Sequence, residues 1–586
     1  MKNLILALIL AIISSLEPNF LIAQYRIYVH PDLGVDLGND GRNISNPIRT
    51  LYRAGQVCHG LDTIFIRGGI FTAYQDTFYQ QDTSGLNPIW IMPYFNESVI
   101  LDGNGYNFQS WEAILNVVHS RNVIIENLHL RNNLNGGAGI RIVSEDNPLF
   151  ITKDVLVKNC LIHDIFRQGI LIQANNVTID KCEIYNAVLR NINGLLGDSG
   201  WEVALGTYLW PNTINCWTNI VFKNNIIHNS WGEGIVALRC YNFLIENNHV
   251  YDCFSAYIYV DNSRKGVIRS NWIHSTNDIY NRHYNNNFYA PGIGIQWAAE
   301  QNSYGVDSLI SDLDIYNNLI VRTNAPISWW RSPQNTYFNN SYENINVYYN
   351  TIYNTFGYEG FHLDVNTTGI YTPLNCNFKN NIICKGQYPL GSYQQYITPS
   401  SHYHNWQIDY NCFIHSDIPI NIPISHNIEG SPSFIDSTNI GLDSNFKISS
   451  ISNCRFTAVP INSINIDYWK ALRNNNFPCI GFHEYGGISG TGFIENEMPG
   501  NYKLEQNFPN PFNPTTNLEF QIPKPGFVSL TVFDLIGKEI ATVVKENLNP
   551  GKYNYKFNGN NISSGIYFYR FESNGVVLNK RMILIK

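Results

Sequence analysis

Residues 221–238 read VFKNNIIHNSWGEGIVAL. An alternating apolar strand leads into two asparagines, a second short apolar run follows, and a glutamate then stands between two glycines. Similar segments recur along the chain, so this stretch is a unit of a repeating scaffold, part of an active site, or both.

The first half of the stretch recurs as an alternating strand that ends in an Asn or Cys. The equivalent residues are Cys160, Cys182, Asn225, Asn248, Asn271, Asn318, Asn350, Asn381 and Asn411, separated by 22, 43, 23, 23, 47, 32, 31 and 30 residues. A shortest step of 22 or 23 residues with period-2 alternation and no helical period predicts one coil of a right-handed parallel β-helix. Stacked coils place equivalent residues about 4.8 Å apart, so we expect the asparagines to form a ladder of amide hydrogen bonds. Cys160 and Cys182 are either small buried members of this ladder or a disulfide.

The second half recurs as GIRIV (139–143), GILIQ (169–173), GIVAL (234–238), YIYVD (257–261), GIGIQ (292–296), PISWW (326–330) and GFHLD (360–364). Alternation directs the second and fourth residues of each segment into the core and the third and fifth toward solvent. The predicted outward residues include Arg141, Gln173, Tyr259, Asp261, Gln296, Trp330, His362 and Asp364. A polar and aromatic row at the coil spacing suits a long sugar chain.

The composition and the first residues of the chain limit the classes of protein to which it can belong. Only 14% of the 586 residues are charged and the net charge is -8, which argues against a nucleic-acid partner. Residues 1–23 have one lysine, an apolar run and a small residue at Ala23, as in a secretory signal peptide. Eleven cysteines are too few for a disulfide scaffold in a chain of this length. The sequence therefore predicts an exported protein, which we expect to be a monomer.

The chain from Tyr25 to Gly487 resembles the right-handed parallel β-helix, or pectate-lyase-like, superfamily of secreted polysaccharide-active proteins. Its opening, residues 28–71, resembles the family's entry segment, in which a short amphipathic helix near 48–57 caps the first coil. The resemblance implies an all-β solenoid over 24–485. Repeats of this kind specify the fold well and the chemistry poorly.

The last part of the chain has a different character. After a Gly-rich, polar linker at 486–501, short strands bounded by Pro, Gly and Asn over 502–586 predict a small β-sandwich. NPFNPTT (510–516), the V-x-L-x-V-x-D-x-x-G core (528–537), SSGIYFYR (563–570) and a basic end closely resemble the type A sorting domain of the type IX secretion system. This resemblance implies export across the outer membrane through that machinery, followed by release or attachment at the cell surface.

The two longest steps, 43 and 47 residues, indicate insertions within 187–212 and 276–312. Insertions on a rigid scaffold commonly carry function, and these two flank the plain coils of Asn225 and Asn248. We therefore expect a cleft around residues 200–300. Its candidate catalytic groups are Glu233, Asp261, Glu300 and Glu202, and its candidate substrate-binding groups are Trp231, Tyr259, Trp297, Trp330, Arg331, Arg282 and His283.

Two chemistries remain open for this cleft. A hydrolase needs two carboxylates ~5–5.5 Å or ~6.5–9.5 Å apart, and Glu233 with Asp261 or Glu300 is the expected pair. A lyase needs a base, for which Arg264, Lys265, Arg282 and Arg331 are candidates, and commonly an acidic calcium site. Each candidate also has a structural interpretation: Glu233 as a turn cap, Glu202 as a buried hydrogen-bonded carboxylate, Asp261 as turn chemistry.

The only other cofactor suggested by the sequence is a structural Ca²⁺ at Asp32, Asp36 and Asp40, which follow one another at four-residue intervals in a Gly-rich loop. The sequence thus predicts a glycoside hydrolase or polysaccharide lyase delivered to the cell surface. The alternative is a non-catalytic carbohydrate-binding or surface-structural β-helix protein.

Overall fold

The computed structural model describes residues 26–80, 87–95, 97–144, 151–194, 196, 202–208, 217–276, 292–298, 309–330, 341–355, 361–363, 374–385, 406–414, 426–487, 493–495, 502–523, 526–548, 551–560 and 562–585. The chain divides into two compact units, Met1–Ile461 with Asn474–Tyr485, and Asn462–Arg473 with Gly486–Lys586. The predicted signal peptide lies outside the described residues. Among the described residues, no helix has the length and hydropathy needed to cross a bilayer.

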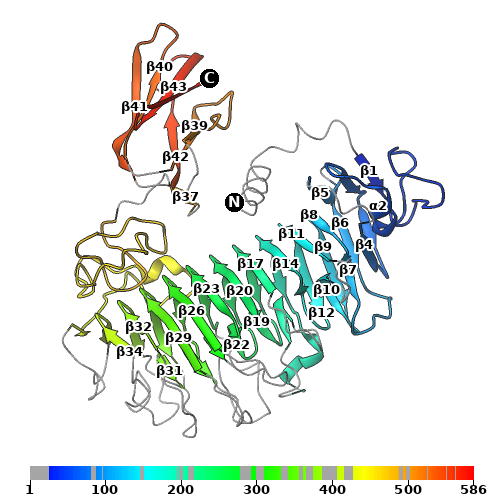
Figure 1. Ribbon diagram of the computed structural model, residues 1–586, viewed down its shortest axis with the longest axis horizontal. Helices are drawn as coiled ribbons and strands as arrows, with labels where there is room; N and C mark the ends of the chain where they lie inside the picture. The colour runs from blue at the N-terminus through cyan, green and yellow to red at the C-terminus, as the bar shows by residue number, and fades with distance from the viewer. Residues whose placement is uncertain are drawn as a thin grey trace. The chain divides into compact units, whose positions relative to one another are not determined.

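The first unit is a solenoid of parallel strands that form three long sheets (Figure 1). Sheet 1 consists of β1 (Arg26–Val29), β2 (Thr63–Ile66), β5 (Ile89–Pro93), β8 (Arg121–Glu126), β11 (Lys153–Lys158), β14 (Asn175–Asp180), β17 (Trp217–Lys223), β20 (Cys240–Glu246), β23 (Arg264–Arg269), β26 (Leu309–Tyr316), β29 (Ser341–Tyr348), β32 (Cys376–Lys379) and β34 (Trp406–Asp409).

Sheet 2 consists of β4 (Asp76–Tyr79), β7 (Ala113–Val118), β10 (Ala138–Val143), β13 (Ile170–Gln173), β16 (Val203–Thr207), β19 (Glu233–Leu238), β22 (Ala256–Asp261), β25 (Ile293–Ala298), β28 (Ile327–Trp330) and β31 (Phe361–Leu363). Sheet 3 consists of β3 (Gly69–Phe71), β6 (Val99–Asp102), β9 (His129–Asn133), β12 (Leu161–Ile165), β15 (Glu183–Tyr185), β18 (Ile226–His228), β21 (His249–Tyr251), β24 (Trp272–His274), β27 (Leu319–Val321), β30 (Thr351–Thr355), β33 (Ile382–Lys385), β35 (Cys412–Ile414) and β36 (Ile428–Glu429). The predicted parallel β-helix is confirmed.

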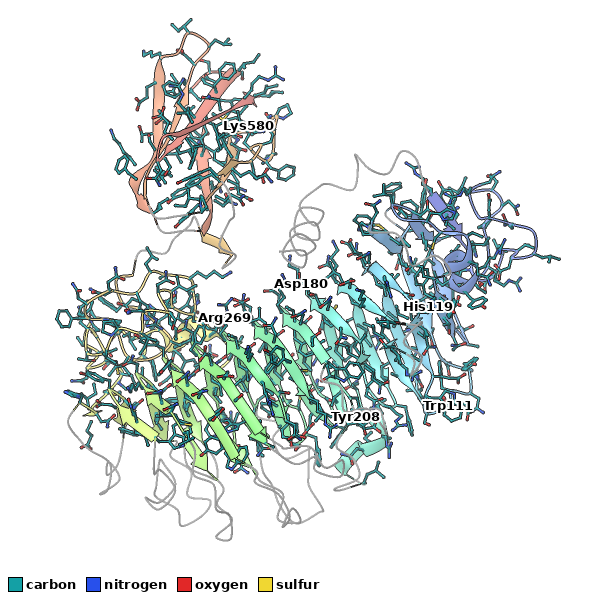
Figure 2. The ribbon with its side chains drawn as sticks, viewed as in Figure 1. Trp111, His119, Asp180, Tyr208, Arg269 and Lys580 are labelled. Atoms are coloured by element: carbon teal, nitrogen blue, oxygen red, sulfur yellow. The ribbon has the colours of Figure 1, made fainter. Side chains whose placement is uncertain are left out.

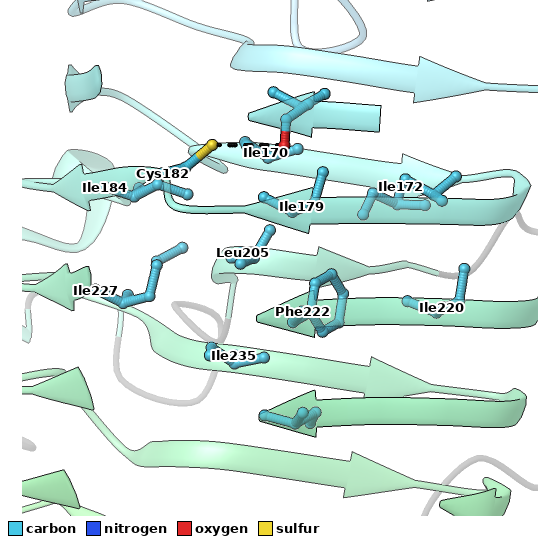
Figure 3. Close-up of a cluster of buried hydrophobic side chains, with 14 of the residues drawn as sticks. Ile170, Ile172, Ile179, Cys182, Ile184, Leu205, Ile220, Phe222, Ile227 and Ile235 are labelled. Carbon is cyan, nitrogen blue, oxygen red and sulfur yellow. Dashed lines mark hydrogen bonds between the residues drawn. The ribbon is translucent and has the colours of Figure 1, made fainter. Parts of the chain in front are cut away.

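The interior of the solenoid is a continuous stack of aliphatic and aromatic side chains from all three sheets. Figure 3 shows part of it, with Ile170 and Leu205 from sheet 2 facing Ile179 and Phe222 from sheet 1. The alternation predicted from sequence holds: Ile140 and Ile142 are fully buried in the core and Arg141 lies between them on the outer face. The short helix α2 (Leu51–Val57) buries Leu51 and Ala54 against the same core, as expected for the entry segment.

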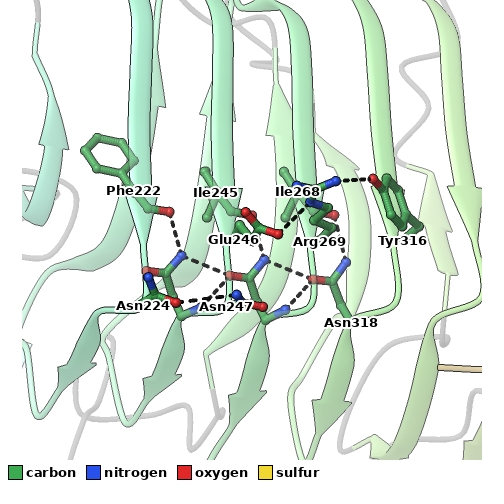
Figure 4. A network of polar contacts seen from close by, with 11 residues as sticks. Phe222, Asn224, Ile245, Glu246, Asn247, Ile268, Arg269, Tyr316 and Asn318 are labelled. Atoms are coloured by element: carbon green, nitrogen blue, oxygen red, sulfur yellow. Dashed lines mark hydrogen bonds and ion pairs between the residues drawn. The ribbon is translucent and has the colours of Figure 1, made fainter. Parts of the chain in front are cut away.

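The predicted asparagine ladder is confirmed, and it runs one step further than predicted. In each step the backbone N–H and the Nδ2 of one asparagine donate to the Oδ1 of the next, at 2.9–3.1 Å. The ladder runs from Asn225 to Asn427, and Cys182 joins it through its backbone N–H at 2.9 Å from Asn225 Oδ1. Figure 4 shows the ladder reaching Asn318, with Asn224 and Asn247 of a second ladder beside it.

The cysteines confirm one of the two alternatives left open by the sequence. Cys160 and Cys182 are both free and buried. Burial raises the pKa of the Cys182 thiol well above its ordinary value. Small size, rather than disulfide chemistry, therefore explains why cysteine replaces asparagine at this corner.

The second unit carries a small two-sheet β-structure, as the sequence predicted. One antiparallel sheet is β37 (Phe493–Glu495), β42 (Gly551–Asn558), β39 (Thr515–Ile522) and β38 (Lys503–Leu504), and the other is β41 (Glu539–Leu548), β40 (Gly526–Phe533), β43 (Gly565–Ser573) and β44 (Val576–Leu584). Side chains such as Phe520, Leu530 and Tyr569 from both sheets share one core.

Candidate functional site

Charged side chains gather beside the first residues of β16 and β19, and they act electrostatically on the phenol of Tyr208, which follows the last residue of β16. We name this group the Glu202 cluster, and it comprises Arg167, Arg190, Glu202, Tyr208 and Glu233. Arg167 lies between β12 and β13, Arg190 in the 3-10 helix η1 (Leu189–Gly194), and Tyr208 directly after β16. Three consecutive coils and one insertion therefore meet at this point.

Glu202 is the centre of the cluster. Its Oε1 accepts hydrogen bonds from Arg167 Nε at 2.9 Å and from Arg190 Nη1 at 2.7 Å, and Arg167 Nη2 also contacts it. The residue is only 4% exposed, and its Oε2 is buried without a hydrogen-bond partner. The structural interpretation of Glu202 as a buried, paired carboxylate thus holds, but one carboxylate oxygen is left unsatisfied, which is costly unless something binds there.

Tyr208 is half-buried on the outer face of sheet 2 (labelled in Figure 2). Its ring packs against Ala113, Ala138 and Leu171. Burial raises the pKa of the Tyr208 hydroxyl, and the nearby charges of Glu202 and Glu233 raise it further, while Arg167 and Arg190 lower it. The phenol is therefore protonated at neutral pH and lies within electrostatic reach of the whole cluster.

Glu233 is held close to Glu202 by the backbone. Its N–H donates to Glu202 O at 2.8 Å, and the side chain is 7% exposed. A Cβ on Gly232 would lie 2.1 Å from Glu202 O, and one on Gly234 would lie 2.4 Å from Tyr257 O. Both glycines are therefore needed for the close approach of adjacent coils, and they place Glu233 in the cluster.

Asp261 does not join Glu233, so this predicted hydrolase pair is wrong. Asp261 pairs with Leu238, five residues along β19 from Glu233. At ~3.3 Å per residue the two backbones are roughly 16 Å apart along the strand direction, so adjacent pairing does not bring the two side chains together. Asp261 is also only 1% exposed.

The predicted aromatic contacts divide between the two faces of sheet 2. Trp297 is fully buried in the solenoid core, edge-on to Tyr342, so it has no face for a sugar and its predicted role is wrong. Trp231 is half-buried and packs against that core. Tyr259 lies on the outer face in an apolar cluster with Val236 and Leu238, but is 8% exposed rather than open to solvent.

The outer row of sheet 2 has the predicted register but not the predicted exposure. Successive strands place one residue each in this row, in the order Arg141, Leu171, Gly206, Val236, Tyr259, Gln296, Ser328 and His362. Gln173, Asp261 and Gln296 are all buried. Trp330 is the last residue of β28 and its backbone pairs with Ala298. The face is therefore covered, in contrast to the open row expected.

Several predicted residues lie elsewhere. Glu300, Arg282, His283, Arg331 and Asp364 lie outside the described residues. Arg264 and Lys265 belong to β23 of sheet 1, and Lys265 Nζ lies 4.9 Å from the ring centroid of Tyr241. These two candidate lyase bases are thus on a different sheet from the Glu202 cluster.

The calcium site predicted at Asp32, Asp36 and Asp40 is wrong. Asp36 Oδ1 accepts from the N–H of Arg49 at 2.7 Å and of Thr50 at 3.1 Å, and Asp40 Oδ1 accepts from Arg42 N at 3.1 Å. These carboxylates organise the entry loop instead of converging. Within the described part of the chain no three His, Cys, Asp or Glu side chains group in a way that could hold a metal ion.

Arg167, Arg190 and Tyr208 were not identified from the sequence. Arg190 and Tyr208 lie within the first predicted insertion, 187–212, where the only acidic residues are Asp198 and Glu202. Their pairing with Glu202 depends on the path of that insertion, which the repeat does not specify.

Two family models match the chain. Residues 57–207 and 211–341 match the right handed beta helix region, and residues 506–586 match the secretion system C-terminal sorting domain. The long first part of this chain is thus a right-handed parallel β-helix. Its last part is a sorting domain that directs export by the type IX secretion system, so the protein is secreted or displayed at the cell surface.

Solved structures of several functions resemble the chain at low identity. The pectate lyase Pel9A is 12% identical with a TM-score of 0.45, and 79% of this chain and 97% of that chain are covered. A rhamnogalacturonan lyase is 13% identical (TM-score 0.41; 78% and 96% covered), as is the Streptococcus pneumoniae surface protein and adhesin PfbA (TM-score 0.38; 60% and 89% covered). No curated protein matches the sequence. These similarities say nothing about the activity of this chain.

Proposed function

We propose that this exported β-helix protein binds an acidic polysaccharide at the Glu202 cluster and cleaves it there. The observation that carries the proposal is the arrangement around Glu202: two arginines share Oε1, Oε2 is buried without a partner, and a protonated tyrosine lies nearby. Buried polar groups left unpaired in this way are a mark of ligand sites.

An acidic sugar fits the local charge better than a neutral one. Arg167 and Arg190 both contact Glu202, so two cationic side chains meet at this point although the whole chain carries -8. A cationic patch on an acidic protein favours anionic substrates such as uronate chains.

Elimination fits the cluster better than hydrolysis does. Both arginines bind Glu202 Oε1, so this carboxylate is engaged, whereas burial raises the pKa of Tyr208 and the phenol holds its proton. In the proposed step the arginines offset the uronate carboxylate charge and Glu233 takes the proton from C5. The C4–O bond breaks as the C4=C5 double bond forms, and Tyr208 gives its proton to the leaving oxygen. Glu233 then releases its proton to water and Tyr208 takes one back from water, which restores both groups.

The test incubates the full chain with neutral and uronate polysaccharides and follows reducing ends together with the absorbance of unsaturated products. We expect both signals on a uronate substrate. Tyr208→Phe should lower kcat by about 100-fold or more, whereas Tyr241→Phe, an exposed tyrosine of sheet 1, should leave it unchanged.

Other outcomes are equally clear. Reducing ends without unsaturated product would mean hydrolysis and would overturn elimination. Binding without either signal would favour the alternative, a non-catalytic carbohydrate-binding module.

A further inference from the structure

The outer face of sheet 3 carries a row of stacked rings. His163, Tyr185, His228, Tyr251 and His274 occupy equivalent positions in successive strands. Their ring centroids lie 4.6–5.1 Å apart, with nearly parallel planes. The spacing of the rings is regular, but the side chains beside them differ from one coil to the next.

Two histidine pairs form diagonally across neighbouring strands. His129 Nε2 lies 2.7 Å from His163 Nε2, and His249 Nε2 lies 2.8 Å from His274 Nε2. Two imidazole nitrogens bound to one ion at ~2.0–2.1 Å lie roughly 2.9–3.4 Å apart for bond angles of about 90–110°. Both pairs need only a small separation to accept an ion.

The surroundings of the His129 pair prepare it for a cation. Asp164 Oδ2 lies 2.7 Å from His163 Nδ1, and Asn186 Nδ2 holds the other carboxylate oxygen at 3.0 Å. A carboxylate at Nδ1 retains a proton there and leaves the Nε2 lone pair directed outward, as it does for metal-bound histidines.

The charged groups nearby act in both directions. The charge of Arg131 acts against a cation at His129, but Arg131 is paired with Asp102 at 2.8 Å, and the carboxylate of Asp164 lies beside His163. We propose that the Nε2 atoms of His129 and His163, with Asp164 supporting His163, bind one divalent transition-metal ion whose remaining positions are filled by water.

The His249 pair provides a matched comparison within the same protein. Ser275 follows His274 where Asp164 follows His163, the charge of Arg322 acts on His274, and Trp272 stacks on His249 at 4.0 Å. The same nitrogen geometry thus occurs without the supporting carboxylate. We expect this pair to remain a hydrogen bond.

The test titrates the tag-free full chain with Ni²⁺ by calorimetry. We expect one equivalent to bind, and His129→Gln and His163→Gln to abolish that binding. Asp164→Asn, a partly exposed position that should keep the fold, should weaken it about 10-fold or more. His249→Gln should leave it unchanged, and circular dichroism checks the fold of each variant.

Three results would overturn the assignment: no Ni²⁺ uptake by the native chain, unchanged affinity in Asp164→Asn, or loss of uptake in His249→Gln instead. Electron paramagnetic resonance with Cu²⁺ gives a second readout, since nitrogen couplings from two imidazoles should disappear in His129→Gln. This site lies on sheet 3, so its outcome is independent of any cleavage at the Glu202 cluster.

Discussion

The corner that carries the asparagine ladder and the outer face of sheet 2 belong to the same coils but follow different rules. At the corner, one residue type recurs because each amide must both donate to the next coil and accept from the previous one. On sheet 2, equivalent positions hold Val203, Glu233, Ala256 and Ile293. The repeat therefore determines the residue type at positions whose contacts are the same in every coil. Positions without such shared contacts can hold different residue types and so different chemistry.

The largest loss of stability is expected from a substitution that interrupts the asparagine ladder. Asn248→Leu removes the acceptor of Asn225 N and Nδ2, and removes donors to Phe222 O and Asn271 Oδ1, at a site 1% exposed. With roughly 1–3 kcal/mol for each buried group left unsatisfied, the free energy of unfolding should fall by about 4 kcal/mol. Urea denaturation measures it; a loss below ~1 kcal/mol would show that the ladder adds little.

A smaller loss is expected at the Glu202 cluster. Glu202→Gln leaves Arg167 and Arg190, whose side chains are 21% and 27% exposed, without their shared anion. Because both guanidinium groups reach solvent in part, we expect about 2–3 kcal/mol, below the usual range for breaking a fully buried pair. Glu246→Gln on sheet 1, which faces Arg269, is the matched control. Equal losses in both variants would mean that the cluster is ordinary structure.

The histidine stack of sheet 3 should make stability depend on pH. Burial and the neighbouring His274 lower the pKa of His249 to about 3, below the ordinary 6.5. The unfolded chain therefore binds more protons between these values, and stability falls as pH drops through that window. Between pH 6.5 and 5 the loss should be about 2 kcal/mol for this histidine.

To check this prediction, the free energy of unfolding is measured for the native chain and for His249→Gln, each at pH 7 and at pH 5. Burial raises the pKa of Asp76 to about 6, and a raised carboxyl pKa stabilises the fold as pH falls, so it acts in the opposite direction. The difference between the two chains removes that contribution. Identical pH slopes would contradict the assignment to His249.

The smallest loss of stability is expected at a third, exposed row of asparagines on sheet 1, which includes Asn219 and Asn242. Asn242 Nδ2 donates to Asn219 Oδ1 at 2.6 Å, but both residues are exposed. Asn242 has a φ of 62°, which glycine adopts readily. Asn242→Gly should therefore change the unfolding free energy by about 0.5 kcal/mol, because water replaces the lost hydrogen bond. A loss near that of Asn248→Leu would mean that burial does not separate the two ladders.

The scaffold could be predicted from the sequence because the ladder residues and the alternating strands leave their spacing in the chain. The same alternation, applied to β25, places Trp297 on the same side as Ile295 and therefore in the core. The prediction of a sugar contact for Trp297 did not take this alternation into account. Arg167 and Arg190 could not be assigned to Glu202, because their meeting depends on an insertion with no period. Nor does alternation reveal whether an outward residue such as Asp261 is covered.

The direction of the ladder has a consequence for the ends of the solenoid. Every step donates from the earlier coil to the later one, from Cys182 through to Asn427. A chain cut short after any of these coils would therefore leave the N–H and the amide NH₂ of its last asparagine without their acceptor. The ladder thus gives the solenoid two unlike ends, one that accepts and one that donates.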